Sequence, residues 1–170
     1  MSERSATIDG GDIPVTNSIT AVGLVEYQCL ASHGHVAVSD ATAPTTVTYF
    51  PGKAVLKAPS ASVKKGRVHL PVHDTPEVVD KTYALYHIRV NFEIESEASV
   101  DFVTVYYDST KVVSTDVNKK NTFHVDFTAN EAMKYKYDVL AGIAVTLDLS
   151  FPDPKSAINL YSVTLVYKAI

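Results

Sequence analysis

The histidines are the side chains of this sequence best suited to metal chemistry. His33 and His35 flank Gly34, so an extended backbone would place both imidazoles on one side, and His69 precedes His73 by four residues. Zinc and copper sites need three or four convergent ligands, and neither pair supplies a third by its spacing. We therefore expect exposed histidines, no metal site and no cofactor.

Other catalytic or ion-binding motifs are missing from the sequence. Asp74 and Asp80 could offer oxygens to calcium, but the segment between them lacks the glycine-punctuated acidic spacing of a calcium loop. The seven glycines form neither a G-x-G-x-x-G nor a G-x-x-x-x-G-K pattern, so nucleotide binding is not indicated. The sequence predicts a protein that is not an enzyme.

Tyrosine is the aromatic residue that could serve recognition, because the chain has ten tyrosines and no tryptophan. Tyr106 and Tyr107 are adjacent, so on a strand one would lie in the core and the other would face outward. Tyr135 and Tyr137 form a second group, and residues 116–121 add Asp and Asn side chains. These residue types suit either a lectin-like glycan site or a protein–protein interface.

The charge pattern argues against nucleic acid as a partner. Fifteen Lys and Arg are scattered among nineteen Asp and Glu, which gives a net charge of −4. The longest basic run, formed by Lys64, Lys65 and Arg67, is interpreted as a solvated turn.

Hydrophobic periodicity of two predicts strands throughout the chain. The clearest segment is 86–95, where alternate residues are apolar, and segments 123–127, 143–151 and 161–167 follow the same pattern. Residues 100–107 are apolar on both faces, which predicts a central strand or one that contacts a partner. Weaker candidates cover residues 19–28, 45–50, 67–73 and 111–115.

Turn residues separate these segments at short intervals, as at Pro51-Gly52 and Asp108-Ser109. Pro71 lacks an amide donor and should lie at a sheet edge or a bulge. Asn130 and Glu131 belong to a capping-box pattern that predicts one or two helical turns. The predicted fold is all-β: one antiparallel β-sandwich domain, jelly-roll-like, with about eight strands and at most one short helix, spanning residues 1–170 with residues 1–12 loose.

Cys29 is the single cysteine, so no internal disulfide can form, although a link between chains could. We interpret it as a half-buried residue at a strand end. The N-terminal residues show no secretory signal and no segment approaches a membrane span, so we expect an intracellular, cytoplasmic protein.

The segment from Gly66 to Val72, with His69-Leu70-Pro71, followed by Thr75-Pro76, is similar to a family of small β-sandwich proteins of bacteria and fungi. The likeness extends over about residues 60–168. In the same neighbourhood the chain resembles the matrix proteins that build intracellular protein crystals in certain fungi. That resemblance implies self-association as the function, with a vacuolar location as a further possibility, and it supplies no active-site residues.

The leading hypothesis is therefore a non-enzymatic structural protein that forms homo-oligomers or larger assemblies. Its predicted assembly interface consists of Val103, Val105, Tyr106, Tyr107 and Cys29. The alternative is a lectin-like carbohydrate-binding module with glycan partners. Neither hypothesis involves nucleic acid or a membrane.

Overall fold

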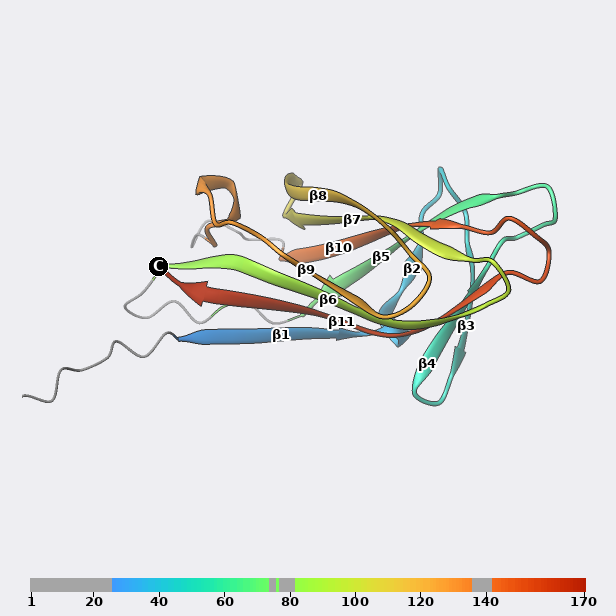
Figure 1. The fold of residues 1–170 in the computed structure, drawn as a ribbon, viewed down its shortest axis with the longest axis horizontal. Helices are drawn as coiled ribbons and strands as arrows, with labels where there is room; N and C mark the ends of the chain where they lie inside the picture. Colours follow the sequence, from blue (N-terminus) through green and yellow to red (C-terminus); the bar gives the residue numbers. More distant parts are fainter. Residues whose placement is uncertain (1–25, 74–75, 77–81, 136–141) are drawn as a thin grey trace, which may run out of the picture.

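The computed structural model describes residues 26–73, 76, 82–135 and 142–170, which form two antiparallel β-sheets packed face to face (Figure 1). The six-stranded sheet contains β1 (Tyr27–His33), β3 (Thr46–Phe50), β4 (Lys53–Lys57), β6 (Tyr83–Glu95), β9 (Phe123–Asp126) and β11 (Ala157–Ala169). The five-stranded sheet contains β2 (Val38–Ser39), β5 (Lys65–Val72), β7 (Ser99–Tyr107), β8 (Thr110–Lys119) and β10 (Ile143–Ser150). The all-β antiparallel sandwich predicted from the sequence is confirmed.

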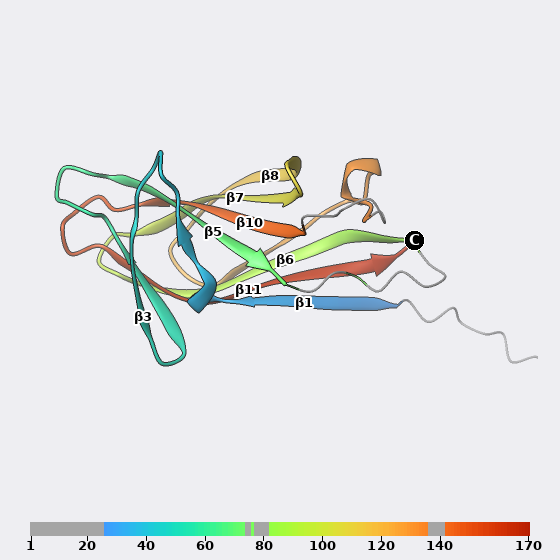
Figure 2. The same ribbon diagram turned by 180° about the vertical axis from the view of Figure 1, so that it is seen from behind.

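The strand order is that of a jelly roll. From β4 to β11 the strands lie in the orders β4-β11-β6-β9 and β5-β10-β7-β8, so that most connections cross from one sheet to the other. Strands β1, β2 and β3 extend the two sheets. β11 pairs with β6 along one side and with β4 and β1 along the other, and Figure 2 shows β1 beside β11. The jelly roll itself has eight strands, β4 to β11, and β1, β2 and β3 are added to it. The predicted segments match seven of these eight strands, all but β4, and the predicted segment 45–50 matches the added strand β3.

The core forms between the sheets because alternate residues of each strand point inward. On the five-stranded sheet the central strand β10 buries Val145, Leu147 and Leu149, each fully. On the six-stranded sheet β6 and β11 bury residues such as Phe92, Leu160 and Leu165. Polar residues of β5, β7 and β10 therefore lie on the outer face of the five-stranded sheet.

Several local predictions are refined by the structure. Strand β1 covers Tyr27–His33 rather than 19–28, of which residues 19–25 lie outside the described residues, and β4 was not predicted. β2 pairs with β5 at Val68 and His69, and Pro71 lies two residues beyond this pairing. Among the described residues no strand pairs with β5 on that side at Pro71, so a residue without an amide donor fits there, as predicted for a sheet edge. The predicted helical turn is the 3-10 turn Glu131–Met133, capped by Asn130.

The described residues include no helix of the length and apolarity that a membrane crossing requires. The loose segment predicted at residues 1–12 lies outside the described residues.

Candidate functional site

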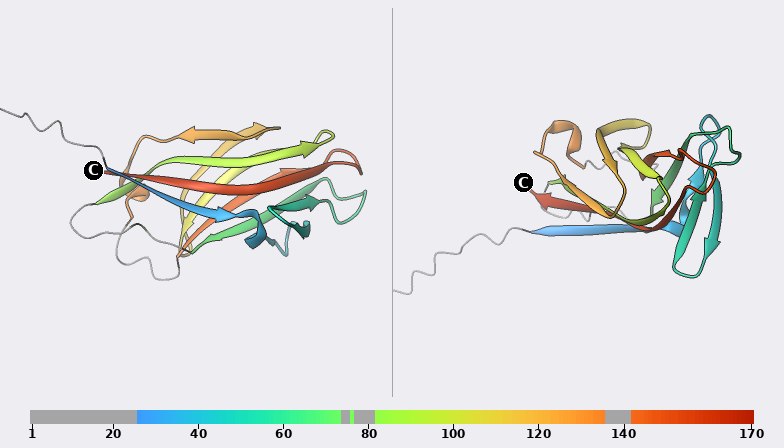
Figure 3. Two further views of the ribbon diagram at one scale, coloured as in Figure 1. Left: turned by 90° about the horizontal axis from the view of Figure 1, so that it is seen from below. Right: turned by 45° about the vertical axis from the view of Figure 1, so that its right-hand side comes forward.

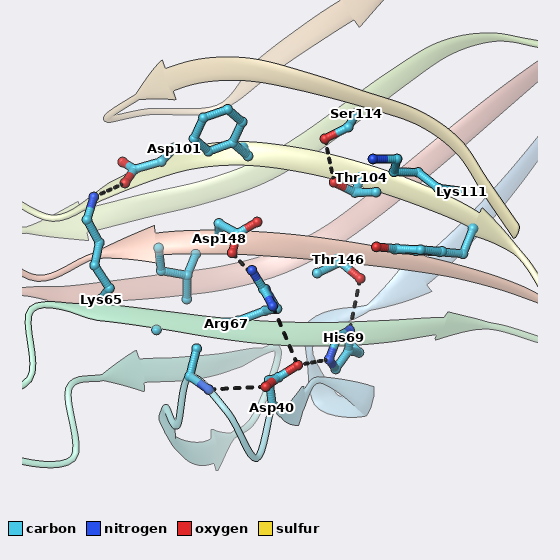
Figure 4. A pocket seen from close by; sticks show the side chains of 15 residues that line it. Asp40, Lys65, Arg67, His69, Asp101, Thr104, Lys111, Ser114, Thr146 and Asp148 are labelled. Carbon is cyan, nitrogen blue, oxygen red and sulfur yellow. Dashed lines mark hydrogen bonds and ion pairs between the residues drawn. The ribbon is translucent and has the colours of Figure 1, made fainter. Parts of the chain in front are cut away.

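A groove of about 670 Å³ lies on the outer face of the five-stranded sheet, over β5, β10, β7 and β8 (Figure 4). Antiparallel pairing aligns outward side chains into rows across this face. One row contains His69, Thr146, Thr104 and Ser114, and the next contains Arg67, Asp148 and Phe102. The groove is therefore built from side chains held in register by neighbouring strands.

Asp40 closes one side of the groove from the loop that follows β2. Its Oδ1 accepts hydrogen bonds from the Thr42 amide and hydroxyl, each at 2.6 Å, and from the Ala43 amide at 3.1 Å. Its Oδ2 lies 2.8 Å from His69 Nε2 and 3.9 Å from the Arg67 guanidinium. The Thr42 hydroxyl, followed by His69 and the backbone amides, holds the pKa of Asp40 well below its usual range, so this carboxylate is ionised and fixed.

Two cross-strand ion pairs run along the groove floor. Arg67 Nε donates to Asp148 Oδ1 at 2.7 Å, and this hydrogen bond raises the pKa of the Arg67 guanidinium. Lys65 Nζ lies 2.6 Å from both Asp101 Oδ2 and Ser150 Oγ. The Arg67–Asp148 pair joins the adjacent strands β5 and β10, and the Lys65–Asp101 pair reaches from β5 across β10 to β7, so the floor is organised before any ligand arrives.

A β-bulge places Asp101 in the groove. The pairing of β7 with β10 shifts register where Leu149 pairs with Val100 and Asp148 with Phe102, which leaves Asp101 as the extra residue of β7. Burial alone would raise the pKa of Asp101, but hydrogen bonds from Lys65, Ser150 and Ser99 outweigh this effect and lower it. Asp101 is therefore a buried anion with its acceptors occupied.

Two aromatic side chains of β7 lie in the same groove. Phe102 is 41% exposed although it is a large apolar residue, and Tyr106 is partly buried four residues farther along. Between them the Thr104 and Ser114 hydroxyls are hydrogen-bonded at 2.8 Å. The groove thus offers an apolar surface surrounded by hydroxyl and charged groups.

His69 is hydrogen-bonded through both nitrogens of its ring. Its Nε2 is hydrogen-bonded with Asp40 and its Nδ1 lies 2.9 Å from Thr146 Oγ1. Thr146 lies in the middle of the sheet at the floor of the groove and is 3% exposed. The arrangement fixes the imidazole ring as part of the groove wall.

The histidine pairs considered as metal ligands do not converge with other ligands. The His33 and His35 rings lie 4.4 Å apart at the end of β1. Across the described residues no group of three His, Cys, Asp or Glu side chains could hold a metal ion. Asp74 and Asp80, considered for calcium, lie outside the described residues.

The residues predicted to form an assembly interface are placed in different environments. Val103, Val105 and Tyr107 are 1%, 0% and 6% exposed and belong to the core, so their side chains offer no surface to a second chain. Tyr106 faces the groove, and Cys29 is exposed within β1 rather than half-buried at a strand end. The bulge at Asp101, in the pairing of β7 with β10, explains the apparent two-faced apolar pattern, because it changes which residues of β7 point inward.

The residues considered for glycan binding are also separated. Tyr106 and Tyr107 face opposite ways as predicted, Tyr135 is buried, and Tyr137 lies outside the described residues. The interpretation of Lys65 and Arg67 as a solvated turn was wrong, because both belong to β5 and line the groove.

Sequence reasoning missed Phe102 and the polar rows of the groove. Alternating polar residues in β5 and β10 were a usable signal, but the pairing of these strands was not evident from the chain.

No family model and no curated protein matches the chain. One similar solved structure is a low-affinity xylan-binding module of family 86 from the gut symbiont Roseburia intestinalis. It is 10% identical in sequence, the match covers 81% of this chain and 94% of that chain, and the TM-score is 0.46. A family 61 module in complex with β-1,4-galactotriose has 12% identity, covers 76% and 85% of the two chains, and gives a TM-score of 0.42. A family 29 carbohydrate-binding module has 12% identity, coverage of 85% and 92%, and a TM-score of 0.40. These similarities are distant, and the fold assignment rests on the strand pairing of this chain.

Proposed function

We propose that this protein is a non-catalytic carbohydrate-binding module whose binding site is the groove on the five-stranded sheet. The observation that carries the proposal is Phe102, an aromatic ring 41% exposed within a groove that is otherwise lined mainly by hydroxyl and charged side chains. An apolar ring face with polar groups around it matches a sugar, which has apolar C–H faces and hydroxyls at its edge.

The balance of charge in the groove favours an uncharged glycan. The cations Lys65, Arg67 and Lys111 are matched in number by the carboxylates of Asp40, Asp101 and Asp148. The ion pairs Lys65–Asp101 and Arg67–Asp148 occupy most of these charges. A charged ligand would have to compete with these pairs, whereas neutral hydroxyls can add hydrogen bonds to them.

The organised floor lowers the cost of binding. Arg67, Asp148, His69 and Asp40 are already connected by hydrogen bonds and ion pairs, so little side-chain freedom is lost when a ligand binds. The aromatic side chains that line the groove are Phe102 and Tyr106, and a groove that extends over four strands suits a chain of several sugar units.

A glycan array followed by NMR titration of the labelled protein tests the proposal. We expect binding to one class of neutral polysaccharide, with amide shifts concentrated at β5, β7 and β10 around Arg67, Phe102 and Thr146. Absence of binding across the array, or shifts that avoid these three strands, would contradict a glycan-binding groove.

Self-association remains a second proposal, favoured by one observation. Among the described residues β11 is the one strand that pairs with β1, and the exposed Tyr27 and Cys29 lie on this strand, where a strand of a second chain could add to the sheet. Sizing chromatography with light scattering tests this edge, and a monomer at high concentration excludes it. If Cys29 links two chains, a dimer on non-reducing gels should disappear in Cys29→Ser.

A further inference from the structure

A second pocket, of about 310 Å³, lies on the other sheet, where the β3–β4 hairpin meets β11. The hairpin extends beyond the body of the sandwich next to β11 (Figure 3). Phe50, Lys53, Lys57, Glu95 and Asn159 line this pocket. It shares no residue with the groove, which lies on the opposite sheet.

Asn159 carries an unsatisfied polar atom in the pocket wall. The residue is 6% exposed, and its Oδ1 is buried without a hydrogen-bond partner among the described residues. Its Nδ2 donates to Glu95 Oε1 at 3.3 Å, so the amide is held in place while the oxygen remains unpaired. Buried acceptors of this kind are costly, and most have a partner in folded proteins. A ligand that brings a donor to this oxygen would remove the cost.

Phe50 provides an aromatic surface at the same pocket. It is 46% exposed at the end of β3 and pairs across the hairpin with Lys53. The ring of His35 forms a hydrogen bond with the Phe50 carbonyl oxygen, which anchors this end of the hairpin to the body of the protein. The exposed ring is therefore attached to a fixed backbone.

The charge of the pocket differs from that of the protein as a whole. Lys53 and Lys57 have no ion-pair partner among the described residues, and they outnumber the single carboxylate, Glu95. Glu95 already accepts a hydrogen bond from Asn159. In a chain of net charge −4, this pocket is a site of positive charge.

We propose that this pocket binds an acidic sugar unit, a uronate. The sugar ring would lie on Phe50, one hydroxyl would donate to Asn159 Oδ1, and the carboxylate would lie between Lys53 and Lys57. Since Asn159 Oδ1 is buried, the hydroxyl has to displace a side chain at the rim, and the long lysine side chains can move. The proposal does not depend on glycan binding in the groove, because no residue is shared.

NMR titration of the labelled protein with galacturonate and glucuronate, with galactose and glucose as neutral counterparts, tests the site. We expect the uronates to shift the Asn159 side-chain amide and the backbone amides of β3 and β4 more strongly than the neutral sugars do. Phe50→Ala should weaken uronate binding by about tenfold, which corresponds to the stabilisation of one stacked aromatic ring. The double variant Lys53→Gln, Lys57→Gln should abolish the preference for uronate over the neutral sugar.

Three controls separate this site from the groove and from non-specific binding. Phe102→Ala removes the aromatic ring of the groove and should leave the uronate shifts at Asn159 unchanged. Sodium acetate provides a carboxylate without a sugar ring, and equal shifts with acetate would overturn the proposal. Unchanged uronate binding in Phe50→Ala would also overturn it, and because Phe50 is 46% exposed this variant should keep the fold. Asn159→Ala adds a direct test of the amide if it folds.

Discussion

Replacing Phe102 by alanine should weaken glycan binding in the groove by roughly tenfold. The side chain is 41% exposed, and a phenylalanine has on the order of 200 Å² of surface, so about 80 Å² of it can be covered. A sugar that covers one face of the ring buries about half of that area, which is worth about 1 kcal/mol at roughly 25 cal/mol per Å². Ring-specific contacts add about 0.5 to 1 kcal/mol, and 1.4 kcal/mol corresponds to about tenfold in Kd.

Isothermal titration calorimetry with the neutral glycan identified on the array measures this change. Phe50→Ala is the matched control, because Phe50 is similarly exposed at 46% but lies on the other sheet. Thermal unfolding of both variants should show small changes, since both rings are partly exposed. Wild-type affinity in Phe102→Ala, or an equal loss in Phe50→Ala, would refute the assignment of Phe102 to the binding surface.

Three further substitutions test how the groove and core are built. Asp101→Asn should lower the free energy of unfolding by about 1 to 3 kcal/mol, measured by denaturant titration. The pKa of Asp101 in the folded protein lies below its ordinary value of 3.8. The stability that wild type has over the variant should therefore be full above pH 3.8 and decrease as the pH falls below 3.8, in titrations repeated at several pH values. Val103→Ala should cost about 2 kcal/mol in the same titrations and leave sizing chromatography unchanged, because Val103 is a core residue. Gly34→Ala would place a Cβ 2.2 Å from the Leu160 carbonyl oxygen, so calorimetry should show a lower Tm, equivalent to about 1 to 3 kcal/mol.

The fold could be predicted from the sequence because it depends on a local signal. Alternation in β6 and β10 follows directly from the pleat of a strand with one face buried. The turns at Gly52 and Asp108 were also recognisable, and both residues adopt positive φ in the structure. Strand order could not be obtained in this way, because pairing between β5 and β10 joins residues far apart in the chain, as with Arg67 and Asp148.

The candidate site was not predictable for the same reason. Lys65 and Arg67 look like part of a basic run until β10 supplies Asp148 and Ser150 opposite them. The apolar pattern of residues 100–107 was misleading because one residue inserted relative to β10, Asp101, changes which residues of the strand face inward. A period-two analysis that allows one bulge would have placed Val103 and Val105 in the core.

The two proposed sites differ in charge although they use the same backbone principle. In the groove, antiparallel register sets cations of β5 opposite carboxylates and hydroxyls of β10, so the charges pair within the protein and neutral ligands are favoured. At the β3–β4 hairpin the residues of β11 that pair with β4 are uncharged, with Asn159 opposite Val55 and Ala157 opposite Lys57. The strand therefore places no carboxylate opposite the lysines, and a negatively charged ligand can pair with them. A polysaccharide with both neutral and acidic units could therefore bind to both sites of one protein molecule. Its apparent affinity should exceed the affinity of a neutral or an acidic fragment alone only if the polysaccharide is long enough to reach from one site to the other. Loss of that gain in both Phe102→Ala and Phe50→Ala would distinguish such bridging from two independent sites.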